Sequence, residues 1–88
     1  MNMTLTITLF GAFRASGADF VALNVQMGAT VADIKSALAV QMALDFPHFD
    51  SASALQNAVL ADEMRVLNND EVISSSKNLA VLPPVCGG

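Results

Sequence analysis

Hydrophobic and polar positions alternate along two neighbouring segments near the start of the chain. Residues 4–10 place Leu5, Ile7 and Leu9 on one face and threonines on the other, which predicts a half-buried strand. Residues 19–25 predict a second strand, in which residues 20–25 repeat the alternation. Because a short connection bounded by glycines joins the two strands, an antiparallel hairpin is the simplest pairing.

A helical pattern replaces the alternation after residue 29. Thr30 is a good N-cap residue, and Asp33 lies three positions later, as in an acidic variant of the capping box. Apolar residues then recur at spacings of three or four, which predicts a helix with one buried stripe. The helix should end near Leu44 or Asp45, because Pro47 disfavours helical geometry in the residue before it. The stripe consists of Val31, Ile34, Leu38 and Met42.

Residues 46–73 have the least regular pattern. We expect a loop over 46–53, whereas the alanine-rich run 54–61 fits either a strand or a helical turn. Turn-forming residues at 68–71 separate two short apolar pairs. The path of this segment through the fold therefore stays open from the sequence alone.

The final strand, expected over 78–82, shows no alternation, since Leu79, Ala80, Val81 and Leu82 are all apolar. Such a strand is typical of an interior strand of a mixed sheet that is covered on both faces. The single long helix can cover one face only. We expect loops or, more readily, a partner protein to cover the other face.

The composition supports the expectation of a partner. The chain has 88 residues, 53% of them hydrophobic and 14% charged. This length suits one domain, and a domain of this size buries only about 60–65% of its chain surface. An apolar excess in so small a domain should leave apolar surface exposed, as at a protein interface.

Charge and residue counts argue against several function classes. The net charge of −4, with only four Lys or Arg residues, argues against nucleic-acid binding. No apolar run reaches the length of a membrane span. One Cys and one His cannot form an internal zinc site, and His48 has no fixed partner for catalysis, so we expect no metal and no independent active site. The start lacks the features of a secretory signal, which favours a cytoplasmic location.

The end of the chain has no packing rationale of its own. Two prolines, which fix φ near −65°, are followed by two terminal glycines that have no side chains to bury. We therefore divide the chain into a folded domain, residues 1–82, and a tail, residues 83–88, which could extend by roughly 20 Å. The tail consists of Pro83, Pro84, Val85, Cys86, Gly87 and Gly88.

The order of elements, the helix opening at 28–33 and the ending at 82–88 resemble the β-grasp sulfur carriers, most closely the small subunits of molybdopterin synthase (MoaD type). The segment from Phe10 to Arg14 is loosely similar to an aromatic-then-Leu-Arg segment of that family. The sequence departs from the family at Cys86, where Ser or Thr is commoner. It also lacks a glycine in the turn before the last strand, and it matches poorly over 46–73.

The resemblance implies an α+β, ubiquitin-like β-grasp fold with a mixed sheet packed on one main helix. It implies that an E1-like adenylating enzyme uses ATP to activate the Gly88 carboxylate, which a sulfur donor then converts to a thiocarboxylate. The large subunit of molybdopterin synthase, joined with this chain in a heterotetramer, would use that sulfur to build the molybdopterin dithiolene. This chain would bind no cofactor itself, and Leu82, Phe10 and Arg14 would join the tail in contacting partners.

Three other functions fit the same residues. A sulfur carrier of the thiamine pathway shares the glycine ending, and a ubiquitin-like modifier would join Gly88 to lysine amines. A plain interaction module of the same fold is the third. Cys86 is most simply a small residue in place of Ser, although its thiol could capture the activated acyl group. Arg14 is most simply a solvated cation that could also contact an acidic partner.

Overall fold

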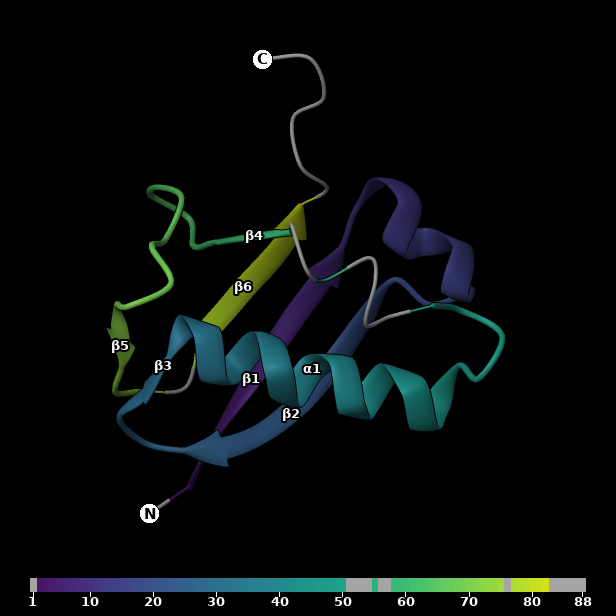
Figure 1. Ribbon diagram of the computed structural model, residues 1–88. Helices are drawn as coiled ribbons and strands as arrows, with labels where there is room; N and C mark the ends of the chain where they lie inside the picture. Colours follow the sequence, from purple (N-terminus) through teal and green to yellow (C-terminus); the bar gives the residue numbers. More distant parts are fainter. Residues whose placement is uncertain (1, 51–54, 56–57, 76, 83–88) are drawn as a thin grey trace.

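A computed structural model of the chain describes residues 2–50, 55, 58–75 and 77–82. A four-stranded mixed sheet has the order β2-β1-β6-β4, and helix α1 crosses one of its faces (Figure 1). A second, two-stranded sheet joins β3 to β5. This is the expected α+β arrangement of a mixed sheet on one main helix. The elements are β1 (Asn2–Leu9), η1 (Gly11–Ser16), β2 (Phe20–Gln26), β3 (Ala29–Thr30), α1 (Val31–Asp45), β4 (Val59–Ala61), β5 (Val72–Ile73) and β6 (Lys77–Leu82).

The predicted hairpin is confirmed. β1 and β2 pair antiparallel, with Leu5 opposite Leu23, and their alternation sends one set of side chains into the core. The connection between them is not a plain loop but the short 3₁₀ helix η1, which buries Phe13. Gly17 ends η1 at a φ of 95°, a left-handed conformation that a residue with a Cβ rarely adopts.

The predicted helix is confirmed at both ends. The Thr30 hydroxyl accepts a hydrogen bond from the Asp33 backbone N–H at 3.2 Å, and the Asp33 carboxylate accepts one from the Thr30 N–H at 3.3 Å. This capping box satisfies two backbone donors that the first turn would otherwise leave unpaired. The predicted stripe is fully buried against the sheet.

The interior position predicted for the last strand is confirmed, whereas its coverage on two faces is not. β6 pairs parallel with β1, through Ile7 and Leu79, and antiparallel with β4. Leu79 and Val81 are buried on the helix side, but Ala80 and Leu82 are only half-buried on the other side. Among the described residues no element lies over that second face, because the one long helix is used on the first (Figure 1).

The irregular segment, residues 46–73, contains two short strands, β4 and β5. One of them pairs with a strand, β3, that the sequence did not predict. β4 adds the edge strand next to β6, so part of the ambiguous alanine-rich run is a strand. β5 pairs with β3, the two residues directly before the helix, for which the sequence pattern predicted no strand. The turn before β3 uses Gly28 at a φ of 90°, and the Gly28 N–H donates to the Ile73 carbonyl oxygen at 2.8 Å.

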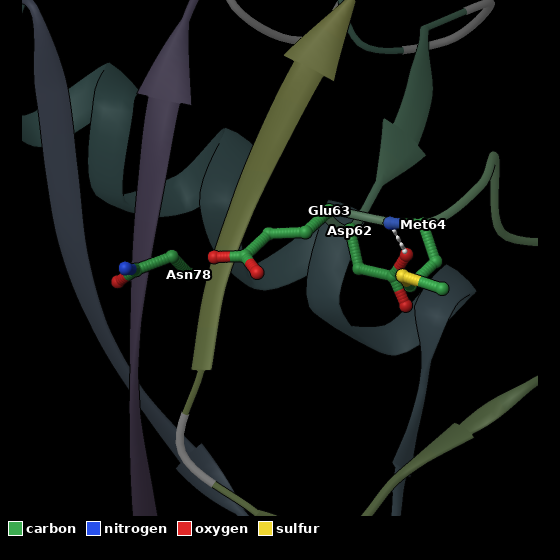
Figure 2. Close-up of a pocket in the computed structure, with 4 residues that line it drawn as sticks. All are labelled: Asp62, Glu63, Met64 and Asn78. Carbon is green, nitrogen blue, oxygen red and sulfur yellow. Dashed lines mark hydrogen bonds between the residues drawn. The ribbon is translucent and has the colours of Figure 1, made fainter.

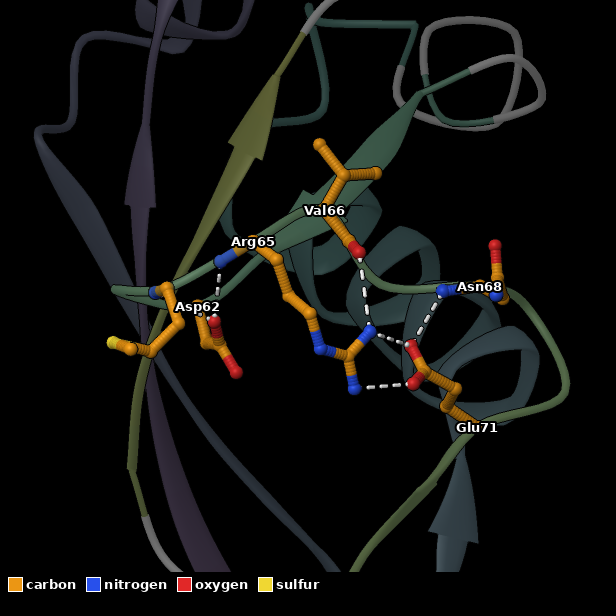
Figure 3. Close-up of polar contacts among 6 residues, drawn as sticks. Asp62, Arg65, Val66, Asn68 and Glu71 are labelled. Carbon is orange, nitrogen blue, oxygen red and sulfur yellow. Dashed lines mark hydrogen bonds and ion pairs between the residues drawn. The ribbon is translucent and has the colours of Figure 1, made fainter.

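A tight turn follows β4 and brings the chain back along the sheet edge. The Asp62 carboxylate accepts hydrogen bonds from the backbone N–H groups of Met64, at 2.8 Å (Figure 2), and Arg65, at 2.9 Å (Figure 3). These bonds satisfy two backbone N–H groups that have no partner in a neighbouring strand, which is the usual role of Asp at the start of a turn. The Asp62 carboxylate therefore holds residues 62–65 beside the sheet together with backbone bonds, among them that from the Asp62 N–H to the Arg65 carbonyl oxygen at 3.0 Å.

An ion pair holds the next part of the segment (Figure 3). Arg65 makes a two-pronged contact with the Glu71 carboxylate, one prong measuring 2.9 Å, and the Asn68 N–H donates to the same carboxylate at 2.7 Å. The hydrogen bond from Arg65, and then that from Asn68, lower the pKa of Glu71 below its ordinary value of 4.5. The bond to Glu71 likewise raises the pKa of Arg65. The contact therefore links the first and last residues of segment 65–71.

Shortening one residue of the buried stripe should be costly. Leu38→Ala should lower the free energy of unfolding by about 2–5 kcal/mol, because it leaves a cavity between α1 and the sheet. Val40→Ala, two residues along on the exposed side of the helix, should change it by less than about 0.5 kcal/mol. Urea unfolding of dilute protein measures both values. Equal losses in the two variants would contradict this packing.

The Glu71 contact should add to stability at neutral pH and not in acid. Its lowered pKa in the folded state means that the stabilisation is complete above 4.5 and disappears as the pH falls through the lower folded value. Glu71→Gln should therefore unfold at a lower urea concentration than the natural chain at pH 7, and the gap should close in acid. Asp70→Asn, a neighbouring carboxylate outside the network, is the control. A gap that does not vary with pH would count against the contact.

Candidate functional site

The parallel pairing of β1 and β6 brings two distant parts of the chain to one edge of the sheet. Leu9, at the end of β1, pairs with Val81, near the end of β6. The residues that follow, Phe10 and Leu82, therefore lie at the same edge, with η1 beside them (Figure 1). By this edge we mean the end of the sheet where the last residues of β1 and β6 lie, and the described part of the chain ends there. The residues predicted to contact partners meet here because parallel strands end on the same side.

The predicted tail lies outside the described residues. This applies to Pro83, Pro84, Val85, Cys86, Gly87 and Gly88, so their roles and the division of the chain at residue 82 stay predictions. Leu82 is described: it pairs with Val59 of β4 and is half-buried. The residue that precedes the tail is thus held in the sheet.

Arg14 lies on the surface, as its simplest interpretation predicted. Its guanidinium Nη2 lies 2.9 Å from Oδ1 of Asp19, and the two side chains are 63% and 80% exposed. A pair this exposed contributes little to stability, because solvent screens it. Arg14 therefore joins η1 to the residue before β2 on the outside of the molecule.

We call the face of the sheet that α1 does not cover the open face. Its apolar part lies near the edge where the chain ends, with Phe10 45% and Phe20 57% exposed. Thr8 lies between Phe20 and Ala80 in the register. Towards the other end the open face becomes polar, and the Thr4 hydroxyl donates to Oδ1 of Asn24 at 2.8 Å. Large apolar side chains exposed together are typical of a protein interface.

Two shallow hollows continue this face towards the turn after β4. The first, of about 220 Å³, lies between Phe10 and Ala80 on one side and Asp62 and Glu63 on the other. The second, of about 390 Å³, is lined by Asp62, Glu63, Met64 and Asn78. Figure 2 shows the Glu63 side chain reaching across β6 towards Asn78. The hollows thus have an apolar side and an acidic side.

The charges around the open face favour a partner with basic groups. Asp62 and Glu63 lie beside the hollows, whereas Arg65 is turned to Glu71 on the same segment (Figure 3). An apolar patch with an acidic border is complementary to an apolar patch with Lys or Arg at its border. The site is therefore suited to docking a protein surface and not to enclosing a small molecule.

The described residues contain no further chemical centre. Over these ranges no group of three His, Cys, Asp or Glu side chains is placed to hold a metal ion. No helix in the described part of the chain is both long and apolar enough to cross a membrane. His48 is exposed in the loop after α1.

Several residues of this face, among them Phe20, Glu63 and Met64, were absent from the site residues predicted from the sequence. Phe20 had a usable signal, since it alternates with the buried Val21 and Leu23 and must therefore point away from the core. Glu63 and Met64 had none, because they reach the face only through the turn that Asp62 holds. Their proximity to Phe10 depends on the position of β4 beside β6.

Comparison with known proteins supports the family that the sequence resembled. No protein-family model matches the chain. The molybdopterin synthase sulfur carrier subunit of Synechococcus elongatus is 34% identical over 91 residues, covering 100% of both chains.

Solved structures give the fold. The small archaeal modifier protein 1 of Haloferax volcanii superposes with a TM-score of 0.68 at 20% identity, over 94% of this chain and 99% of that one. The ubiquitin of Caldiarchaeum subterraneum gives 0.64 at 15%, over 100% of both chains. A putative molybdopterin converting factor subunit 1 of Pyrococcus furiosus gives 0.64 at 21%, over 94% of this chain and 99% of that one. The fold is thus the ubiquitin-like β-grasp, and the full-length identity shows that the chain belongs to the family of molybdopterin synthase sulfur carrier subunits.

Proposed function

We propose that this chain carries sulfur on its C-terminal Gly88 and delivers it, as the small subunit of molybdopterin synthase, for the molybdopterin dithiolene. The observation that carries the proposal is the match along the whole chain to a sulfur carrier subunit of that enzyme. The ending, two prolines and a valine followed by Cys86 and two glycines, supplies the chemical group that the function needs.

The chemistry requires activation of the terminal carboxylate. A carboxylate is a poor acyl donor, so an E1-like enzyme first joins Gly88 to AMP from ATP, releasing pyrophosphate. A sulfur donor then displaces AMP and leaves a thiocarboxylate, the form that transfers sulfur inside the large subunit. Gly87 and Gly88 suit these steps because the absence of Cβ atoms opens the terminal carbonyl to approach from both sides.

The geometry of the domain is compatible with delivery at a distance. The tail begins after Leu82, at the edge that also holds Phe10, and an extended run of this length spans roughly 20 Å. The large subunit would then contact the open face with apolar and basic groups while the tail enters its active site. Arg14, on the same edge, is a candidate contact for an acidic group of that subunit.

The assembly and setting belong to the proposal as well. We propose a heterotetramer with the large subunit, in the cytoplasm, where the lone Cys86 stays reduced. This chain would supply the sulfur and bind no cofactor, with ATP used by the activating enzyme. Cys86 would serve as a small residue in the tail without a covalent role.

A second candidate function is that of a ubiquitin-like protein modifier, because such modifiers share this fold. The small archaeal modifier protein and the ubiquitin have the same architecture at TM-scores of 0.68 and 0.64. If a lysine amine instead of sulfur captured the activated Gly88, the product would be an isopeptide. A carrier for the thiamine pathway would share the thiocarboxylate and differ in the enzyme that accepts the sulfur.

Coexpression with an activating enzyme and a sulfur donor should replace one oxygen of the chain by sulfur. Intact mass spectrometry detects this exchange, and sulfur transfer to the pterin precursor by the large subunit checks its use. Deletion of Gly88 should abolish both, since the chain then ends in a carboxylate on Gly87, one residue short of the position that the activating enzyme must reach, whereas Cys86→Ser should retain both. Isopeptide adducts without the sulfur exchange would favour the modifier, and transfer by the chain without Gly88 would exclude the proposal.

Binding to the large subunit should depend on the open face. Phe20→Asp should weaken the complex at least about tenfold, because it places a charge in the apolar contact. A tenfold change in the dissociation constant corresponds to about 1.4 kcal/mol of binding free energy. Glu63→Lys should mainly slow association and reduce its dependence on salt. Val72→Asp, equally exposed but on β5, is the control. Calorimetry and stopped-flow binding measure the two effects; a complex as sensitive to Val72→Asp as to Phe20→Asp would rule out this face.

A further inference from the structure

Helix α1 has a second apolar side that the core does not use. The buried stripe already fills the space against the sheet, yet Val40 is 63% and Leu44 74% exposed. At 3.6 residues per turn these two lie with Ser36 and Ala43 within about 100° of the helix circumference, opposite the buried stripe. We call these four residues the outer stripe. A helix that is apolar on both sides is typical of one with a partner on each side.

The outer stripe carries no charge. The charged residues of α1 are Asp33 and Lys35 near its start and Asp45 at its end, with none from residue 36 to residue 44. Asp33 is engaged in the capping box, and Lys35 lies 3.4 Å from the Asn69 side-chain oxygen. Asp33 is exposed on the same side of the helix as the outer stripe, about two turns before Val40, so the part of this side without an ionised group runs from Ser36 to Leu44. Covering that part desolvates methyl groups and one hydroxyl.

We propose that the outer stripe binds the outer stripe of a second copy of this chain, with the two α1 helices antiparallel. The charge distribution selects this occupant. The chain has a net charge of −4, and the open face has Asp62 and Glu63 at its border, so two copies repel each other there. Between Ser36 and Leu44 the outer stripe is an exposed apolar surface on which two acidic copies can meet with no ionised side chain of the stripe in the contact.

The antiparallel arrangement is favoured by the helix ends and by side-chain size. It sets the partially positive start of each helix beside the partially negative end of the other. A two-fold axis at Val40 places Leu44 of one copy at the height of Ser36 of the other, so a large side chain meets a small one. A parallel arrangement would instead set Leu44 beside Leu44 and like helix ends together.

The dimer should be weak and should leave the open face free. The contact is limited to one pair of helices of 15 residues, each about 22 Å long, which is less than the standard interface of about 1,600 Å² provides. α1 and the open face lie on opposite sides of the sheet (Figure 1). Two carriers could therefore associate back to back while each presents its own tail edge.

Sedimentation velocity on the full chain, from micromolar to millimolar concentration, tests the dimer. The natural chain should pass from monomer to dimer as its concentration rises. Leu44→Glu and Ser36→Lys should each raise the dimer dissociation constant at least about tenfold. Met64→Glu, at an exposed apolar residue on the other side of the molecule, should leave it unchanged. Circular dichroism confirms that each variant keeps its helix.

Mixing the two helix variants tests the orientation. In an antiparallel pair, Glu at position 44 of one chain faces Lys at position 36 of the other, so the mixture should form a heterodimer that neither variant forms alone. A mixture that stays monomeric would reject the antiparallel register. A natural chain that is monomeric at every concentration, or a dimer lost in Phe20→Asp and kept in Leu44→Glu, would overturn the proposal.

Discussion

The packing of the buried stripe of α1 against the sheet is the contact on which the structure depends. Val31, Ile34, Leu38 and Met42 are fully buried and share one core with the inward-facing residues of β1 and β6. In the described part of this small chain α1 is the one long helix, and it can cover one face of the sheet only. The same packing that forms the core therefore leaves the other face open. An exposed apolar face here is a consequence of size, and it is available for a partner.

The parallel pairing of β1 and β6 determines where the candidate site lies. It joins the first strand to the last, so that Phe10 and Leu82 come to one edge beside η1. Anything that follows residue 82 starts from this edge. Pairing on both sides of β6 holds Leu82, the last described residue, in the sheet.

Charge separates the two exposed apolar surfaces. The open face has acidic groups at its border, held by the Asp62 turn and stabilised further along by the Arg65–Glu71 contact. The outer stripe of α1 has none. An acidic border selects a basic partner, whereas an uncharged stripe accepts a copy of the same acidic chain. One small domain can thus offer different surfaces to different partners because its few charges are unevenly placed.

The sequence by itself determined the parts that depend on neighbouring residues. The hairpin, the capping box at Thr30 and Asp33 and the buried stripe follow from local periodicity and hydrogen bonding, and they were predicted correctly. The glycine ending pointed to the family that the full-length comparison then supported. Tertiary structure decided the rest: the β3–β5 pair, the edge shared by Phe10 and Leu82, and the place of Glu63 and Met64 beside the open face. These features join residues far apart in the chain. The pairing of a short strand depends on the neighbouring strand that the packed core places beside it, so the local sequence pattern does not predict it.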